Sequence, residues 1–359
     1  MKRREFGKVL TAGTIGSAVS LNKTTIAQPK KALMYAGNHQ SFRVNDKDLQ
    51  YLQRFGVTSK IASPTFITDK GWDINEILQW KDKCREYDIT LEGLVLPYRA
   101  INRPNVPNFM LGNFDKGERE TDIFNECIRV ASKAGMRLLL LSLKDHENVS
   151  TSAGIGRGEY SSRRFNLKEA LEKKPPNYYD TPLTEEQNWE RITFFLERVI
   201  PVATEYKVQI ANHPCDPWLP PGFRGIDRVL GGFEGFKKYI EICPSPYHGL
   251  LLCLGCFAEA CDNPATEVYD HVKYFAERKK IFWVHYRNIT GSKNNFMEVF
   301  PDEGVVDMFR VAKVLYDAGY PYALDPDHYP RHPDDKGRYQ SGAYQYGYIN
   351  AMIQAVSRS

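Results

Sequence analysis

The stretch Gly249-Leu250-Leu251-Leu252-Cys253-Leu254 decides the fold class. It is short, apolar and uninterrupted, as a strand must be when both faces of a parallel sheet are covered. It also carries Cys253, whose thiolate is a soft ligand for transition metals. Three other apolar runs end in a metal-binding residue: Ile210-Ala211-Asn212-His213, Phe282-Trp283-Val284-His285 and Ala323-Leu324-Asp325-Pro326-Asp327. Four such ends in succession predict one metal site, an enzyme, and a barrel that gathers the strand ends.

Eight apolar runs alternate with amphipathic stretches between residues 28 and 359. We expect strands at 32–36, 59–63, 91–96, 138–143, 208–212, 249–254, 281–286 and 321–324. Helical spacing of apolar residues predicts helices at 73–87, 119–134, 184–206, 234–242, 266–278 and 305–318. Eight strands alternating with helices favour an α/β fold, a single-domain (β/α)8 TIM barrel. Two long polar segments, 99–118 and 144–183, follow the third and fourth strands and are expected to act as lids over the site.

The formal charge of +4 is confined to the N-terminus. The first 27 residues alone carry this net charge, so the remaining chain is near neutral and gives no electrostatic case for nucleic-acid binding. No GxGxxG or GxxxxGK[ST] motif follows an expected strand, so dinucleotide and P-loop sites have little support. With 42% hydrophobic residues in 359, the chain suffices for one large core.

The basic N-terminus resembles a twin-arginine export signal. It reads Lys2-Arg3-Arg4-Glu5-Phe6-Gly7-Lys8 and is followed by a weakly apolar stretch, 9–21, that is too short and polar for a stable membrane span. Thr25-Ile26-Ala27 offers small residues for cleavage before Gln28. We therefore expect residues 1–27 to be a signal peptide read by the twin-arginine (Tat) machinery, and the mature protein to be exported, into the periplasm. The alternative is a frayed basic tail.

The four strand-end donors differ in chemistry. His213 and His285 offer nitrogen, Cys253 sulfur and Asp327 oxygen, a mixture typical of Mn²⁺, Fe²⁺, Co²⁺ or Zn²⁺ rather than of Mg²⁺. Each residue alone has a simpler explanation, because a single strand-end histidine is often structural and a buried cysteine often only packs. Cys253 also begins a Cys-x-x-Cys sequence with Cys256, so a redox pair is an alternative.

Polar residues beside these donors are candidates for substrate contact and proton transfer. Asn212, Arg287 and Asn288 flank the ligands, and Arg287 could clamp a substrate carboxylate through two hydrogen bonds or form a salt bridge at the rim. His328 follows Asp327 directly and could act as general acid or base, because imidazole titrates near neutral pH. Its alternative is a hydrogen bond within the surrounding turn.

Residues 208–350 resemble the mannonate dehydratases, relatives of the xylose-isomerase-like barrels. The matching pieces are Asn212-His213-Pro214-Cys215-Asp216-Pro217, Leu252-Cys253-Leu254-Gly255, Val284-His285-Tyr286-Arg287-Asn288, Val306-Asp307-Met308, Pro326-Asp327-His328 and Gly342 to Gly347. The resemblance implies Mn²⁺ or Fe²⁺ on His213, Cys253, His285 and Asp327, with His328 in proton transfer. It also implies loss of water from a six-carbon aldonic acid, giving 2-keto-3-deoxygluconate.

The chain departs from the family pattern near the C-terminus. Ala343 stands where the family has a tyrosine, and Tyr344 follows it, so Tyr344 is a second catalytic candidate if the loop shifts by one residue. Cys256 and Tyr329 also replace a family serine and glycine. Two alternatives therefore stay open: a xylose-isomerase-like sugar isomerase or epimerase, and an exported sugar-acid binding protein with an impaired site. A homo-oligomer is compatible with every reading.

Overall fold

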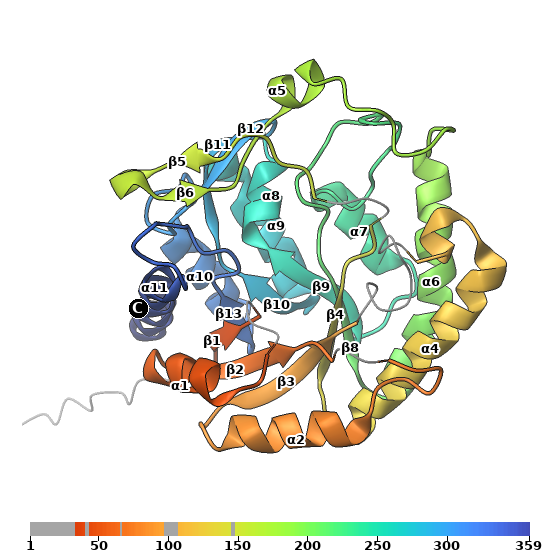
Figure 1. Cartoon of the computed structure of the whole chain (residues 1–359), viewed down its shortest axis with the longest axis horizontal. Helices are drawn as coiled ribbons and strands as arrows, with labels where there is room; N and C mark the ends of the chain where they lie inside the picture. The colour runs from red at the N-terminus through yellow and green to blue at the C-terminus, as the bar shows by residue number, and fades with distance from the viewer. Residues whose placement is uncertain (1–32, 40–42, 65–66, 97–106, 145–147) are drawn as a thin grey trace, which may run out of the picture.

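Eight parallel strands close into a barrel. The computed structural model describes residues 33–39, 43–64, 67–96, 107–144 and 148–359; the expected signal at 1–27 lies outside them. The closed barrel has the strand order β1-β13-β10-β9-β8-β4-β3-β2, with helices around it (Figure 1). Its strands are β1 (Tyr35–Asn38), β2 (Val57–Ala62), β3 (Thr90–Val95), β4 (Leu138–Leu141), β8 (Gln209–Asn212), β9 (His248–Cys253), β10 (Ile281–His285) and β13 (Ala323–Asp325). Each overlaps an expected strand, and the (β/α)8 barrel is confirmed.

The expected helices all occur, and further helices accompany them. The six predicted ones are α2 (Ile74–Arg85), α4 (Phe114–Lys133), α6 (Glu185–Glu205), α7 (Phe233–Glu241), α9 (Pro264–Glu277) and α10 (Met308–Asp317). Thr184 caps α6 through a reciprocal pair of hydrogen bonds with Gln187, which together form a capping box. Sequence periodicity did not identify α1 (Asp46–Arg54), the short α8 (Leu254–Glu259) or the C-terminal α11 (Tyr339–Arg358).

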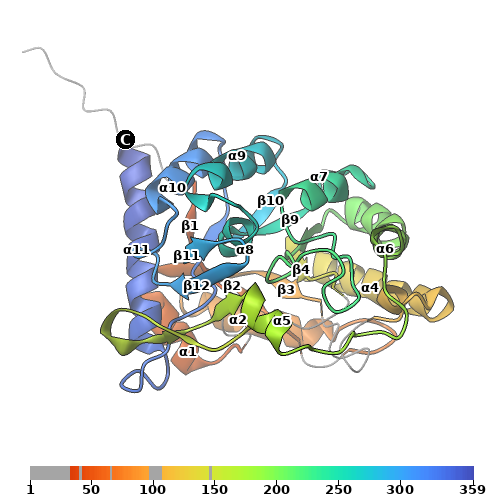
Figure 2. The ribbon, with the colours of Figure 1, turned by 90° about the horizontal axis from the view of Figure 1, so that it is seen from above.

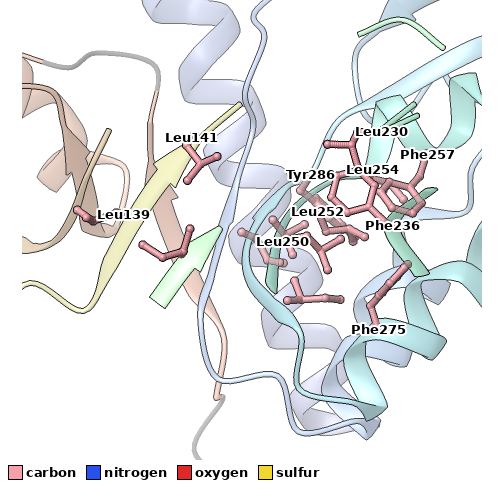
Figure 3. Packing of buried hydrophobic residues seen from close by; sticks show 14 of the residues in the cluster. Leu139, Leu141, Leu230, Phe236, Leu250, Leu252, Leu254, Phe257, Phe275 and Tyr286 are labelled. Carbon is pink, nitrogen blue, oxygen red and sulfur yellow. The ribbon is translucent and has the colours of Figure 1, made fainter. Parts of the chain in front are cut away.

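The core has two parts, which explains why the strands are apolar on both faces. Leu139, Leu141, Leu250 and Leu252 face outward and pack with helix side chains such as Phe236, Phe257 and Phe275 (Figure 3). A second cluster faces the barrel interior and includes Leu138, Leu140, Leu251 and Trp283. Burial of a large aliphatic side chain contributes about 1.5–3 kcal/mol. Continuous apolar strands therefore satisfy both layers at once.

Trp283 fills the barrel interior below the strand ends. It is fully buried, and its indole N–H donates to Asp325 at 3.2 Å. A Cβ atom on Gly37 would lie 2.7 Å from the Trp283 ring and 2.6 Å from the Cβ of Ala323. Gly37 in β1 therefore permits the close approach of Trp283, and this tryptophan forms a floor beneath the residues at the ends of β10 and β13.

A small antiparallel sheet lies over the strand ends. Its strands are β11 (Asn288–Ser292), β12 (Asn295–Val299) and β7 (Arg164–Asn166), in the order β11-β12-β7. Beside it lie the β5–β6 hairpin (Gly154–Ile155 and Ser161–Ser162), the 3-10 turn η2 (Arg157–Glu159) and α5 (Leu167–Glu172), whereas the 3-10 turn η1 (Phe109–Leu111) packs against α4 and α6. Figure 2 shows β11, β12 and α5 together on one side of the barrel.

The described part of the expected lid segment 144–183 is anchored to this small sheet. Asn166 pairs with Asn295 and Arg164 with Met297, so the segment is held on the β11–β12 hairpin. Of the other expected lid, 99–118, only residues from 107 onward are described. No helix within the described residues is long and apolar enough to span a bilayer.

Candidate metal centre

The structure brings the four predicted donors together. His213 follows β8, Cys253 ends β9, His285 ends β10 and Asp327 follows β13. Their ligand atoms all lie within 4.8 Å of one another. Strand register explains the convergence, because His285 is paired with Cys253 on one side and with Asp325 on the other. Adjacent parallel strands thus end at the same level of the barrel.

The charges at this cluster prepare its donors to bind a cation. Burial alone would raise the pKa of Cys253, but contact with Cys256 and the charge of Arg287 hold that pKa well below its usual value. Burial is likewise outweighed at Asp327, whose pKa is lowered by His285 and His328. Burial disfavours a charged His285, yet Asp327 and Cys253 raise its pKa to about 10. The negative charges of the Cys253 thiolate and the Asp327 carboxylate therefore favour a protonated His285. A divalent cation would supply the balancing positive charge in place of the proton on His285.

The two histidines present a specific nitrogen to the cluster. Nδ1 of His213 lies 2.7 Å from the Pro214 carbonyl, which can only accept, so Nε2 is left for a metal. Nδ1 of His285 is buried and lies 3.3 Å from Oδ2 of Asp327. This nitrogen has no hydrogen-bond partner among the described residues. A buried ring nitrogen aimed at a thiolate and a carboxylate fits a borderline divalent ion.

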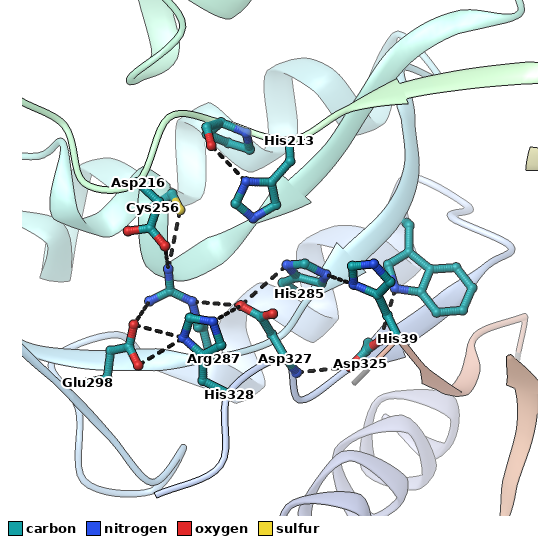
Figure 4. Close-up of polar contacts among 12 residues, drawn as sticks. His39, His213, Asp216, Cys256, His285, Arg287, Glu298, Asp325, Asp327 and His328 are labelled. Carbon is teal, nitrogen blue, oxygen red and sulfur yellow. Dashed lines mark hydrogen bonds and ion pairs between the residues drawn. The ribbon is translucent and has the colours of Figure 1, made fainter. Parts of the chain in front are cut away.

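His328 lies next to the four donors and is held by a carboxylate. Its Nδ1 lies 2.9 Å from both oxygens of Glu298, a residue of β12 that is almost fully buried (Figure 4). Its Nε2 is 3.7 Å from Oδ2 of Asp327. Burial would lower the pKa of His328, but Asp327 and Glu298 outweigh it and raise this pKa to about 9. One ring nitrogen is therefore anchored and the other is directed toward the cluster.

Arg287, predicted to clamp a substrate carboxylate or to form a salt bridge at the rim, lies among buried protein carboxylates. The side chain is 2% exposed, and its nitrogens donate to Asp327 at 3.0 Å, to Glu259 at 2.8 Å and to Asp216 at 3.3 Å. Glu298 lies 3.2 Å from the same guanidinium. Its donors are committed to protein carboxylates, so in this arrangement Arg287 orders the residues beside the site.

Asn288, also predicted to contact substrate, is hydrogen-bonded to backbone groups on both sides of its amide. Its amide donates to the carbonyls of Pro301 and Val306, and its oxygen accepts from the backbone N–H groups of Ile289 and Val306. Asn212 is different. Its oxygen accepts from Leu143 N–H at 2.7 Å, while its buried amide nitrogen has no partner within the described residues. Of the three predicted substrate contacts, Asn212 keeps an uncommitted donor.

Tyr344 does not take up the role expected of a shifted catalytic tyrosine. It lies in α11, 43% exposed, with its ring against Phe300 at 5.3 Å. Its hydroxyl interacts with Asp302 and Arg157. These contacts place Tyr344 in a cluster at the surface, and its predicted catalytic role stays a prediction.

A second acidic group lies beside the centre but is already neutralised by arginine. Asp216, Cys256 and Glu259 form a buried group with metal-like spacing. Arg163 pairs with Asp216, and the Arg287 guanidinium contacts all three side chains, including Cys256 Sγ at 3.2 Å. Two guanidinium groups thus occupy the place of a cation there. The four-donor cluster is the site that fits a metal.

A family model described as UxuA, D-mannonate dehydratase, matches residues 163–358, more than half of the chain. The chain belongs to the D-mannonate dehydratase family. A mannonate dehydratase of Thermotoga neapolitana is 28% identical over 326 residues, covering 80% of this chain and 87% of that protein. One from Streptococcus agalactiae is 32% identical over 181 residues, covering 48% of this chain and 51% of its own length.

Solved structures agree on the fold. The crystal structure of mannonate dehydratase from Streptococcus suis serotype 2 superposes with a TM-score of 0.78 at 21% identity, covering 90% of this chain and 94% of that one. An L-ribulose 3-epimerase gives 0.54 at 14% identity, covering 90% and 96%. At these identities the likeness concerns the barrel. All four donors and His328 fall inside the residues that match the D-mannonate dehydratase family.

Sequence reasoning missed two residues of this D-mannonate dehydratase family site. Glu298 lies in the small sheet, and no strand was expected between 286 and 305. His39 directly follows β1, and its ring lies 3.0 Å from the ring of His285. The four donors were found as metal-binding residues at strand ends, and His39 is placed in the same way. The first strand, however, was expected to end at residue 36, three residues before His39.

Proposed function

We propose that this protein is a metal-dependent hydro-lyase that removes water from a sugar acid of the mannonate type, leaving a 2-keto-3-deoxy acid. Membership of the D-mannonate dehydratase family supports the reaction class. The observation that carries the proposal is the convergence of His213, Cys253, His285 and Asp327 within 4.8 Å, at the strand ends of a barrel of that family. Mn²⁺ or Fe²⁺ suits this donor set.

The reaction has two demands that a barrel site of this kind can meet. The C2 proton beside a carboxylate is weakly acidic, and the C3 hydroxyl is a poor leaving group unless it receives a proton. A divalent ion bound by the four donors would stabilise the negative charge that develops on the substrate carboxylate. Loss of the C2 proton and of the C3 hydroxyl gives an enol. The enol becomes the 2-keto acid when its C2 hydroxyl loses a proton and C3 gains one.

His328 is our candidate for one of these proton transfers. Glu298 holds Nδ1 at 2.9 Å, so the proton on that nitrogen stays between the two side chains. Nε2 is then the nitrogen that exchanges a proton with the substrate, and it faces the cluster near Asp327. The Glu298 carboxylate fixes both the tautomer and the plane of the ring, as second-shell carboxylates do in other histidine sites.

The test is a turnover assay on purified protein lacking residues 1–27 and supplied with Mn²⁺ or Fe²⁺. We expect D-mannonate to yield a 2-keto-3-deoxy acid, detected as a new 2-keto group with loss of one water by mass spectrometry. Interconversion of a neutral sugar without loss of water would favour an isomerase. Ligand-induced stabilisation without product would favour a sugar-acid binding protein. Either result would reject the dehydratase.

We further propose that residues 1–27 direct export through the twin-arginine machinery, into the periplasm. The support is the Lys2-Arg3-Arg4-Glu5-Phe6-Gly7-Lys8 sequence and the small residues before Gln28. We expect an exported form whose intact mass begins at Gln28 and a retained precursor when both arginines are changed to lysine. A full-length cytoplasmic product from the native sequence would reject this part of the proposal.

A further inference from the structure

His39 contacts the candidate metal ligand His285 on the side of the ring that faces away from the four-donor cluster. It lies just after β1, the first strand of the barrel, and reaches His285 at the end of β10. Nδ1 of His39 is 3.0 Å from Nε2 of His285. The two rings are nearly parallel, with centroids 5.1 Å apart and planes inclined by 22° (Figure 4). The contact is a hydrogen bond between two imidazoles, in which either ring could donate.

The opposite side of the His285 ring decides which one donates. Its Nδ1 is directed to the four-donor cluster, 3.3 Å from Asp327. A ring nitrogen that binds a cation must offer a lone pair, so a metal-bound His285 carries its proton on Nε2. That proton then points at Nδ1 of His39. The bond forms only when His39 accepts there and carries its own proton on Nε2.

The other two histidines of the site show how unusual this partner is. Nδ1 of His213 faces a backbone carbonyl, and Nδ1 of His328 faces the Glu298 carboxylate. Both oxygens can only accept, so each fixes one tautomer without further conditions. Nδ1 of His39 can accept or donate. It therefore favours the metal-binding tautomer of His285 only when the His39 ring carries its own proton on Nε2. It also lies outside residues 163–358, the part matched by the family.

We propose that His39 is a positioning residue that selects the His285 tautomer and ring orientation able to bind the divalent cation. The inference rests on the proposed metal centre and adds a residue that family membership does not supply. Its basis is the 3.0 Å contact between the two rings together with the opposite placement of Nδ1 of His285. Loss of an outer-shell partner of this kind typically weakens metal binding about 10- to 100-fold.

Two variants and one control separate this role from simple packing. His39→Leu removes the acceptor, whereas His39→Gln keeps an oxygen that can accept from His285. His332→Leu removes a histidine from a polar loop and serves as the control, because its ring faces Asp334. The measurements are the Mn²⁺ affinity of each protein by calorimetry and the ¹⁵N spectrum of the histidine rings with Zn²⁺ as a diamagnetic probe.

We expect His39→Leu to bind Mn²⁺ about 10- to 100-fold more weakly than the parent. We expect His39→Gln and His332→Leu to bind Mn²⁺ about as tightly as the parent does. In the Zn²⁺-loaded parent, the His39 ring should carry its proton on Nε2 and leave Nδ1 unprotonated to accept from His285. This spectrum decides the question even if His39→Leu fails to fold.

Parent-like Mn²⁺ affinity in a folded His39→Leu variant would overturn the inference, as would a proton on Nδ1 of His39 in the Zn²⁺ form. In either case a parent protein that still binds Mn²⁺ and dehydrates mannonate would leave the proposed function standing. If the parent itself binds no divalent metal, the proposed centre and this inference both fail.

Discussion

Both carboxylate oxygens of Glu298 lie 2.9 Å from Nδ1 of His328. The two residues belong to different parts of the fold. Glu298 lies in a strand of the small antiparallel sheet, and His328 lies in the loop after the last barrel strand. The small sheet thus contributes to the chemistry of the site by orienting a ring. It also explains why His328 can remain 39% exposed at its side chain and still keep a fixed orientation.

Glu298→Gln should slow turnover while leaving the metal in place. The amide retains size and one acceptor but loses the charge that fixes the His328 ring, so we expect kcat to fall about 10²-fold. His328→Gln should fall about 10²- to 10⁴-fold, since it removes the proton-transferring group itself. Steady-state kinetics with metal analysis checks both. Loss of metal in the Glu298 variant would show that it supports the ligands instead.

His285→Ala should lose both the bound metal and activity, because Nδ1 of this ring faces Asp327 and Cys253 from the centre of the donor set. Metal content measured after purification in Mn²⁺ is the readout. The His328→Gln variant is the matched comparison, as it removes a neighbouring imidazole but no ligand. Full metal retention by His285→Ala would count heavily against the assignment of the four ligands.

Arg287→Met should destabilise the protein by about 3–5 kcal/mol, because it leaves buried carboxylates without their counter-charge. Asp216 and Glu259 are the residues that lose most, since each pairs directly with the guanidinium. Arg157→Met is the control: its ion pair with Asp302 is 55% exposed on the arginine side and should change stability by less than about 1 kcal/mol. Denaturant unfolding of the two variants compares them, and equal losses would contradict the structural role of Arg287.

Tyr344→Phe should leave kcat and metal content near those of the parent. The hydroxyl interacts with Asp302 and Arg157 at the surface, so its removal breaks a solvent-screened contact and no proton path. The same kinetic assay applies. A fall in kcat comparable to that of His328→Gln would restore Tyr344 as the second proton donor and refute its assignment to the surface cluster.

His248 should make the protein less stable in acid. It is fully buried at the start of β9, and burial lowers its pKa from 6.5 to about 3. The unfolded chain therefore takes up a proton below pH 6.5 that the folded chain refuses until about pH 3, so stability falls as pH decreases through this window. Each pH unit costs about 1.4 kcal/mol.

The variant His248→Gln isolates this effect. Its amide can still donate to the Cys243 carbonyl, which Nδ1 of His248 contacts at 3.2 Å, but it does not titrate. Denaturant unfolding at several pH values should give a shallower loss of stability between about pH 6.5 and pH 4.5 for the variant than for the parent. Identical slopes would mean that the His248 pKa is not depressed.

The barrel and the four donors could be predicted from sequence because their signal is local. A run such as Leu250-Leu251-Leu252 is apolar on both faces, and that pattern requires a covered parallel strand. The residue at the end of such a run must lie at one rim of the barrel, where neighbouring ends meet. The position of Cys253 and His285 at the ends of neighbouring strands was therefore enough to predict that they lie close together.

The partners of these residues could not be predicted in the same way, because they depend on side-chain direction and on elements with weak patterns. Arg287 was expected to face substrate, yet its side chain points to protein carboxylates beside the site. Gly255 leaves room for it, because a Cβ on this glycine would lie 2.3 Å from the guanidinium. Glu298 belongs to a short mixed strand that periodicity does not reveal. Tyr344 was placed by motif spacing, which says nothing about the direction of a helical side chain.

The seam between β1 and β13 joins the first and last strands of the barrel. β13 pairs directly with β10, so Asp327 can meet His285 without this seam, whereas β1 is placed beside β10 only through β13, so His39 reaches His285 only when the seam is closed. A cation held by the four donors, with His285 oriented by His39, would bind most tightly when the seam is closed, and its binding energy would oppose reopening of the seam. Metal affinity should thus report on whether the first strand has joined the barrel, even though every proposed ligand comes from the second half of the chain.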